Sequence, residues 1–232
     1  MPDGSYSQFC PVSMAAEIIC SRWTLLVLRE LLLGSTHFNE LRRGLPGMSP
    51  ALLSKRLKDL EAAGLVTRTA TGREPNASEY CLTDAGLELR PIIEAIGVWG
   101  HRWVTTEATL RNLDANLLMW DIRRNINTDP MPSSRNTIQF IFNDRPPSER
   151  NYWLIVEPGN GVDLCLVDPG FDVDLYVSAD LRTMTEIWLG YTPIGRALDE
   201  GRLGLTGSSN LAADLRMWLK LSVFAKIEKK VA

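Results

Sequence analysis

Histidine and cysteine are scarce in this sequence of 232 residues, and their scarcity restricts the chemistry open to the chain. His37 and His101 are the only histidines, and the four cysteines, at positions 10, 20, 81 and 165, form no CxxC pair. A structural zinc site needs four Cys or His ligands, usually at short spacings. We therefore predict no metal and no cofactor, and we expect the thiols to be reduced.

Long apolar segments are also missing. The most apolar stretch, TLLVLRELLLG at 24–34, is interrupted by Arg29 and Glu30 and falls far short of the ~20 apolar residues that a membrane span needs. The first twelve residues, MPDGSYSQFCPV, lack the basic and apolar regions of a secretory signal. These features predict a cytoplasmic protein.

The residue patterns of common catalytic sites are absent. No histidine follows His101, and GRLGLTG at 201–207 lacks the strand-then-helix context of a phosphate-binding loop. Asp144 and Asp168 fall at turn positions, and Cys165 lies inside an apolar run, as a core thiol does. We predict that the protein is not an enzyme.

Charge is distributed unevenly along the chain. The composition, 45% hydrophobic and 23% charged, is that of a globular protein, and the formal net charge is −3. Residues 22–73 carry nine Arg and Lys against four Asp and Glu. The average charge argues against a uniformly basic nucleic-acid binder, but it conceals this local basic excess.

The stretch MSPALLSKRLKDLEAAGLV, residues 48–66, has the signals of a helix with two faces. Ser49 can cap the first N–H groups, Pro50 suits the first helical position, and Gly64 suits a left-handed stop. At about 100° per residue, three leucines gather on one side and a small, basic set on the other: Leu53, Leu57 and Leu60 against Ala51, Ser54, Lys55 and Lys58. A surface helix with a solvated basic face would show the same pattern, so the neighbouring segments decide.

Those neighbours give the order helix, helix, helix, helix, hairpin, helix. Three helices are predicted before the two-faced helix: one over 11–20, a second that starts near Ser21, and a third over 36–47. The apolar residues of the second are Leu25, Leu28, Leu31 and Leu32. Two β-rich runs in 65–83 flank a loop, and Thr83 and Asp84 open a long helix over 83–103. A short helix, a turn, a two-faced basic helix and a hairpin are the plan of a winged helix-turn-helix.

Five stretches of the first half strengthen this interpretation: CPV (10–12), WTLLVLRELLLG (23–34), FNELRRGLPGMSPALLSKRLKDLEAAGLV (38–66), YCLTDAGLEL (80–89) and VWGHRW (98–103). Together and in this order they resemble the HxlR family of bacterial transcription regulators. The resemblance covers about residues 8–104. It implies a homodimer whose two winged helices bind double-stranded DNA at an imperfect inverted repeat near a promoter.

The predicted DNA-binding residues lie on the short helix, the two-faced helix and the hairpin. Lys55 and Lys58 offer charge to phosphates, Ser54 can reach phosphate or base, and Ala51 can lie against a thymine methyl. The wing, TATGREPNASE at 69–79, departs from the family pattern because it has little positive charge beyond Arg73, which predicts a weak grip on the minor groove. The full set is Asn39, Arg42, Ser49, Pro50, Ala51, Ser54, Lys55, Lys58, Arg68 and Arg73.

The helix predicted over 83–103 carries an apolar stripe at three- and four-residue spacing: Leu89, Ile92, Ile93, Ile96, Trp99 and Trp103. Such a stripe most often packs within its own domain. Four other helices already supply a core here, so we predict that the stripe pairs with a second copy of the chain. Pro91 lies inside this helix and predicts a kink or a broken hydrogen bond.

The second half has a different pattern. An amphipathic helix at 113–126 precedes four strand-like runs, at 137–144, 151–158, 162–169 and 172–179, whose spacing predicts an antiparallel sheet. Helical patterns return at 180–191 and 193–202, LGLTG at 203–207 is strand-like, and one amphipathic helix is predicted to close the chain over 210–227. The fold class is α+β.

The segment DVDLYVSADLRTMTEIWLGYTPIGRALDEGRLGLTGSSNLAADLRMWLKL, residues 172–221, resembles the sterol-carrier-protein-like lipid-binding domain. The resemblance covers about residues 112–226 and implies an α/β sandwich with an antiparallel-rich sheet of five strands and an apolar tunnel. Candidate lining residues are Trp120, Phe140, Phe142, Trp153, Trp188 and Trp218, each of a type that is more often plain core. We predict two domains, 1–107 and 112–232.

The sequence is compatible with three functions. The first is a dimeric regulator whose carboxy-terminal domain binds an apolar or lipid-like small molecule and biases the DNA-reading helices. The second is a thiol sensor, because HxlR relatives often use a cysteine at the CPV position, here Cys10, although an inert cysteine would fit the pattern too. The third is a lipid carrier with a vestigial DNA domain, against which intact Ser49, Pro50, Lys55 and Lys58 argue.

Overall fold

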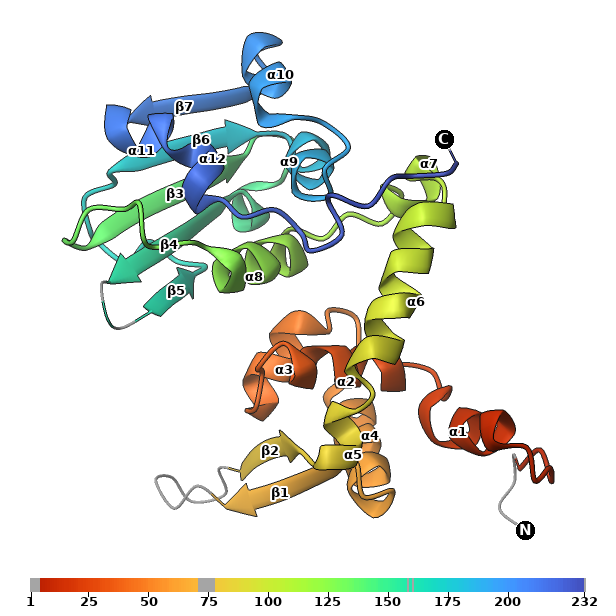
Figure 1. Cartoon of the computed structure of the whole chain (residues 1–232). Helices are drawn as coiled ribbons and strands as arrows, with labels where there is room; N and C mark the ends of the chain where they lie inside the picture. The colour runs from red at the N-terminus through yellow and green to blue at the C-terminus, as the bar shows by residue number, and fades with distance from the viewer. Residues whose placement is uncertain (1–4, 71–77, 158, 160, 232) are drawn as a thin grey trace. The chain divides into compact units, whose positions relative to one another are not determined.

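The structure is a computed structural model that describes residues 5–70, 78–157, 159 and 161–231 (Figure 1). The chain folds into two compact units, residues 1–97 and 98–232. The boundary between them falls inside one helix, α6 (Arg90–Trp103).

The first unit consists of short helices followed by a hairpin. Its elements are α1 (Pro11–Ile19), α2 (Thr24–Leu32), α3 (Phe38–Gly44), α4 (Pro50–Ala62), β1 (Val66–Ala70), β2 (Ser78–Leu82) and α5 (Asp84–Leu87). The strands pair antiparallel with Val66 opposite Leu82. The N–H of Tyr80 donates to the Thr36 carbonyl at 2.8 Å, so the segment before α3 joins the hairpin. This order confirms the predicted winged helix-turn-helix plan.

Buried aliphatic side chains hold this unit together. The core contains Val27, Leu28, Leu31, Leu41, Leu45, Met48, Leu53, Leu57, Leu60, Leu65 and Val66. Helix α2 begins at Thr24 rather than near Ser21, because Trp23 has φ +78° and cannot be helical. Leu25 and Leu32 of the predicted apolar face are only half-buried.

The helix predicted over 83–103 is in fact two helices, α5 and α6. Thr83 caps the first, accepting a hydrogen bond from the Gly86 N–H. Glu88 and Leu89 form a turn, in which the Leu89 N–H donates to the Gly86 carbonyl at 3.3 Å, and α6 starts at Arg90. Pro91 has no N–H to donate to the Leu87 carbonyl, so the break lies where proline predicts an interruption.

The second unit is a five-stranded sheet with helices. Its elements are α7 (Thr106–Thr109), α8 (Ala115–Asn125), β3 (Asn136–Phe142), the 3₁₀ turn η1 (Pro147–Glu149), β4 (Asn151–Glu157), β5 (Gly161–Cys165), β6 (Leu175–Ala179), α9 (Leu181–Trp188), α10 (Ile194–Asp199), β7 (Leu203–Gly207), α11 (Ser209–Ala213) and α12 (Leu215–Trp218). The strand order is β5-β4-β3-β6-β7 (Figure 1).

The sheet is antiparallel-rich, as predicted, but one pair departs from the antiparallel pairing expected of consecutive runs. Strands β3 and β6 are parallel, with Ile138 opposite Leu175, whereas the other three pairs are antiparallel. Residues 166–174 do not form a hairpin turn. They carry the chain back to the start of β3, where Asp174 and Thr137 exchange hydrogen bonds: Asp174 N–H to Thr137 carbonyl at 2.9 Å, and Thr137 N–H to Asp174 Oδ2 at 2.7 Å.

One apolar core joins the helices to one face of this sheet. Alternate residues of β3, β4 and β6 meet side chains from α8 to α12; the largest are Met119, Phe140, Phe142, Tyr152, Met184, Trp188 and Trp218. The Tyr152 hydroxyl donates to Asn116 Oδ1 at 3.2 Å. Burial raises the pKa of Tyr152 to about 12, so this phenol stays a neutral donor.

The closing helix predicted over 210–227 is also wrong. Helix α11 ends at Ala213, α12 ends at Trp218, and Leu219 forms a β-bridge with Ile126 instead of continuing the helix. Residues 220–231, which we call the C-terminal strap, are not helical. The strap passes so close to Gly190 that a side chain there would overlap the Ala225 backbone.

The strap is tied to the ends of two helices. The N–H of Ser222 donates to the Trp188 carbonyl at α9, and the N–H of Lys230 donates to the Arg102 carbonyl at α6, at 3.0 and 2.9 Å. The Lys229 ammonium donates to the carbonyls of His101 and Val104. The strap thereby satisfies carbonyls that the last turn of α6 leaves without helical partners.

No single helix among the described residues is long and apolar enough to cross a membrane. Helices α1 and α2 reach that length and composition only as a pair, bent by 81° at the break between them.

Candidate nucleic-acid interface

Helix α4 has the ends and the buried side that the sequence predicts. Ser49 Oγ accepts a hydrogen bond from the Leu52 N–H at 3.3 Å, Pro50 occupies the first helical position, and Gly64 has φ +72°. Each of the leucines Leu53, Leu57 and Leu60 is at most 1% exposed. The helix is therefore anchored along one side, and its orientation in the unit is determined by the core.

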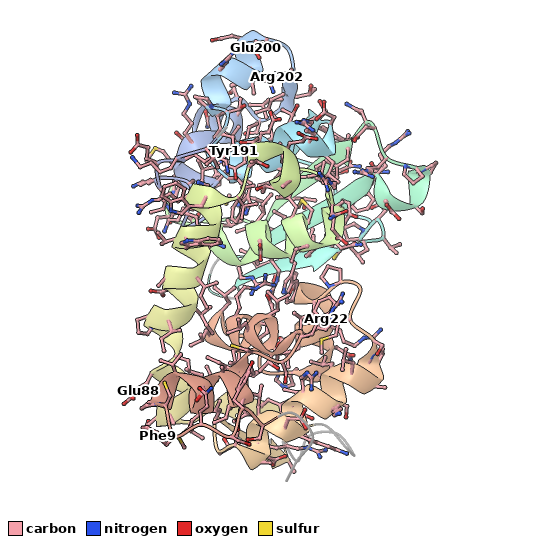
Figure 2. The ribbon with its side chains drawn as sticks, turned by 90° about the vertical axis from the view of Figure 1, so that its right-hand side faces the viewer. Phe9, Arg22, Glu88, Tyr191, Glu200 and Arg202 are labelled. Atoms are coloured by element: carbon pink, nitrogen blue, oxygen red, sulfur yellow. The ribbon has the colours of Figure 1, made fainter. Side chains whose placement is uncertain are left out.

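The other side of α4 is open. Ala51, Lys55 and Lys58 are exposed and Ser54 is partly exposed. The remaining basic residue of this helix, Arg56, is used within the fold: its Nε donates to the Arg22 carbonyl at 3.0 Å and its Nη1 pairs with Asp59 at 2.9 Å. Figure 2 labels Arg22, which directly precedes Trp23, the residue with φ +78°.

Helix α3 precedes α4 and contributes two exposed predicted residues, Asn39 and Arg42. Its start is fixed by Glu40, whose Oε2 accepts hydrogen bonds from the N–H groups of Thr36 and His37 at 3.0 and 3.1 Å. Leu41 and Gly44 face the core. The predicted polar groups of α3 and α4 thus all lie outside the core.

The hairpin places Arg68 on its exposed side, but not as an isolated cation. Arg68 Nε donates to Ser78 Oγ at 2.9 Å, and its guanidinium lies 6.0 Å from the centre of the Tyr80 ring. Arg73 lies outside the described residues.

A buried acidic residue lies behind these helices. Glu30 has no exposed side-chain surface, and it interacts with Arg29 and Ser35. Sequence reasoning misses this role, because the pattern shows Glu30 only as an interruption of an apolar run. A signal is present, since Glu30 is three residues after Val27 and shares the buried side of α2.

The apolar stripe predicted over 83–103 divides into two parts. Leu89 and Ile93 pack against the core of the first unit. Ile92 and Ile96 are each 47% exposed, Trp99 is 63% exposed and Trp103 is 49% exposed. Four of the predicted dimerisation residues therefore present apolar surface, and Leu89 serves the fold of its own unit.

The six aromatic residues predicted to line a ligand tunnel are all buried. Phe140, Phe142, Trp188 and Trp218 belong to the core that joins helices and sheet. The Trp218 indole N–H donates to the Leu211 carbonyl at 2.8 Å. Trp120 lies beneath the guanidinium groups of Arg123 and Arg124, and Trp153 lies in β4 opposite Cys165.

Cys10 is exposed at the position just before α1. The backbone N–H groups of Ser13 and then Val12, at the start of α1, lower the pKa of the Cys10 thiol. Cys20 and Cys81 are also exposed. Within the described ranges, no three His, Cys, Asp or Glu side chains gather in a group that could hold a metal ion.

A short helix, a turn, a capped helix with a buried leucine side and an open basic side, and an antiparallel hairpin define a winged helix-turn-helix protein. This chain belongs to the HxlR-like helix-turn-helix family, whose family model matches residues 18–108. Relatives of the first unit carry names of transcriptional regulators. The residues after 108 lie outside the matched region.

Two of these relatives show the extent of the similarity. YvaP of Bacillus subtilis, an uncharacterized HTH-type transcriptional regulator, is 40% identical over 99 residues, which are 42% of this chain and 92% of YvaP. A regulator of the same description from Methanothermobacter thermautotrophicus is 36% identical over 103 residues, 44% of this chain and 77% of the relative. A solved structure, the redox regulator HypR in its reduced form, is 33% identical with a TM-score of 0.38, over 39% of this chain and 90% of HypR.

Proposed function

We propose that the protein is a transcription regulator that binds double-stranded DNA as a homodimer and inserts α4 into the major groove. The observation that carries this proposal is the construction of α4. Its leucines are buried, its first turn is capped by Ser49, and Lys55, Lys58 and Ala51 are left exposed. A recognition helix needs one side that is packed in the core of its domain and an opposite side that is accessible to DNA.

The dimer is supported by the exposed part of the α6 stripe. Ile92, Ile96, Trp99 and Trp103 recur at three- and four-residue spacing on one helix, and each is close to half exposed or more. Paired helices from two copies would remove this surface from water. A twofold dimer matches a DNA site with twofold symmetry, which is an inverted repeat with half-sites roughly 10 base pairs apart or a multiple of that.

Selection of sequences from a random duplex library by the purified protein tests this function. We expect enrichment of an inverted repeat, and light scattering of the bound complex should give two chains per duplex. Failure to enrich any sequence, with the protein folded, would reject the proposal.

We propose further that the second unit is a sterol-carrier-like module that takes an apolar small molecule and thereby changes DNA affinity. In support, a five-stranded sheet and its helices enclose a core rich in aromatic side chains, among them Phe140, Phe142 and Trp188. Ligand binding to the folded unit would raise its melting temperature by mass action. Native mass spectrometry and melting with fatty acids, sterols and polycyclic aromatics test this, and absence of any shift would leave the unit as a structural support.

Thiol sensing is a second candidate, favoured by the lowered pKa of the exposed Cys10 thiol. A larger thiolate fraction at neutral pH speeds reaction with oxidants and electrophiles. Under this alternative, treatment with diamide changes the DNA affinity of the unmodified protein but not of Cys10→Ser. An equal response of both proteins would exclude Cys10 as the sensor.

A further inference from the structure

Arg29 links the buried carboxylate of α2 to the end of α3. Its Nη2 lies 2.8 Å from Glu30 Oε1 and also donates to the Gly44 carbonyl at 2.8 Å. Arg29 Nε donates to the same Glu30 oxygen at 3.2 Å, while Ser35 Oγ donates to Glu30 Oε2 at 3.3 Å. One guanidinium therefore holds a side chain of α2 and the last residue of α3 in a fixed relation.

Gly44 fits this arrangement because it has no side chain. A Cβ at position 44 would overlap the Glu30 carboxylate, and the three atoms nearest to that Cβ all belong to Glu30. The backbone of α3 can approach the carboxylate only at a glycine. Gly44 is the last residue of α3, and the turn to Ser49, the cap of α4, begins directly after it.

A buried ion pair is a poor source of stability. Glu30 is removed from water, which is costly for a charge, while Arg29 stays partly exposed, and a well-packed apolar pair of similar volume is often as stable or more stable. The pair does impose directional hydrogen bonds at one place, which apolar packing cannot do. This pair binds the last residue of α3, next to the turn that leads into α4. Directional hydrogen bonds at this place can fix the geometry of that turn.

We propose that Arg29 and Glu30 are positioning residues for sequence discrimination by α4. They fix the end of α3, and through it the turn that sets where α4 begins. This inference rests on the proposed function, namely that α4 reads DNA.

The expected defect is selective. Long lysine side chains such as Lys55 and Lys58 reach phosphates from many backbone positions, so interactions that carry no sequence information tolerate a small shift of α4. Hydrogen bonds and methyl contacts to base edges depend closely on position, and a good bidentate hydrogen-bonded pair discriminates against the wrong base by roughly five- to 150-fold. Disruption of the Arg29–Glu30 link should therefore reduce discrimination more than general affinity for DNA.

The test uses the double variant Arg29→Met/Glu30→Met of the full chain, which replaces the ion pair with unbranched apolar side chains. Affinity is measured for the duplex that the unmutated protein selects from a random library and for a scrambled duplex of the same composition. We expect the melting temperature to stay within a few degrees, the affinity for the scrambled duplex to stay within about twofold, and the ratio of the two affinities to fall about tenfold. The dependence of scrambled-duplex affinity on salt should not change.

Two further variants complete the experiment. Arg135→Met/Glu157→Met removes an ion pair of 2.7 Å in the second unit and should leave the ratio unchanged. Arg29→Lys keeps the charge, and Arg29 is 32% exposed, so this variant should fold even if the double variant does not. The lysine nitrogen lies one bond nearer the backbone than Arg29 Nη2, and lysine has no second nitrogen to replace the Nε contact with Glu30, so the ratio should fall here too.

The outcomes separate the two proposals. If the unmutated protein selects no duplex, the DNA-reading function itself fails. If it does select one, an unchanged affinity ratio in both Arg29 variants overturns the positioning role. An equal decrease in affinity for both duplexes, accompanied by a large drop in melting temperature, would also overturn it, because Arg29 and Glu30 would then act only on stability.

Discussion

The side chain of Lys229 donates a hydrogen bond to the backbone carbonyl of His101 at 3.2 Å, across 128 positions of sequence. The same ammonium lies 5.0 Å from the centre of the Tyr191 ring, and the His101 ring lies 5.3 Å from that ring. Figure 2 labels Tyr191, which belongs to the turn after α9. The C-terminal strap is thus fastened to α6 through a cation at the negative end of the helix.

Lys229→Ala should destabilise the second unit by about 1 kcal/mol, because it removes a charged donor from carbonyls at the end of α6. The measurement is chemical denaturation followed by the fluorescence of the tryptophans in that unit. Lys220→Ala, which removes an exposed lysine from the same strap, is the control and should cost much less. Equal effects of the two variants would mean that the Lys229 hydrogen bonds contribute nothing to stability.

Stability of the second unit should also depend on pH through His101. Burial, and secondarily the charge of Lys229, lower the pKa of His101 below its ordinary value of 6.5, although a hydrogen bond with the Ile227 backbone opposes this. The unfolded chain therefore binds this proton more readily than the folded chain. The contribution of neutral His101 is complete above pH 6.5 and is lost as the pH falls from 6.5 toward the lower folded pKa.

The measurement is the free energy of unfolding between about pH 7.5 and 5. It should decrease on acidification, by at most about 1.4 kcal/mol per pH unit from one proton. His101→Gln should flatten the profile in this range. A slope that is the same in the variant would assign the pH dependence to other groups.

Lys55→Ala and Lys58→Ala should each weaken DNA binding while leaving the fold and the oligomeric state intact, since both side chains are exposed. Removing one lysine–phosphate interaction should reduce the slope of log K against log salt by about 0.9. Fluorescence anisotropy at several salt concentrations gives this slope. Lys226→Ala, an exposed lysine of the second unit, should behave as the unmutated protein does, and unchanged affinity in both α4 variants would rule out this face as the DNA surface.

Ile96→Asp should convert a dimer to a monomer, because it places an unpaired charge in an apolar interface. Sedimentation equilibrium at micromolar concentration should show at least a roughly tenfold weaker association. Val223→Asp introduces the same charge at a side chain that is 72% exposed in the strap, and it should leave association unchanged. The idea would be refuted by an unmutated protein that is already monomeric under these conditions.

The parts of the fold that local chemistry specifies are predictable. Ser49, Pro50 and Gly64 determine the ends of α4 within one turn of chain, and the period of Leu53, Leu57 and Leu60 determines its buried side. Pro91 likewise marks the interruption of the long helix. Such signals act between near neighbours, so they can be read from the sequence alone.

The parts that depend on distant partners are not predictable in this way. Residues 210–227 do have a helical pattern. However, Leu219 pairs with Ile126, and backbone N–H groups of the strap donate to carbonyls at the ends of α9 and α6; these hydrogen bonds replace those of a continued helix. The role of Glu30 escapes prediction because the groups around it include Ser35 and the glycine at the end of another helix. A carboxylate inside an apolar pattern indicates a buried polar interaction, but it does not name the partner.

The parallel pair of β3 and β6 has a consequence for how the second unit folds. Strands β3, β4 and β5 follow each other along the chain and can pair through short loops, whereas β6 reaches β3 only after a crossover from the far edge of the sheet. Non-local pairing of this kind slows folding. Until residues 175–179 are available, the side of β3 that pairs with β6 is a strand edge without a partner, with Ile138 and Phe140 within it. An exposed apolar strand edge is a template for pairing with other chains, so the interval before β6 is added is when this protein is most prone to aggregate.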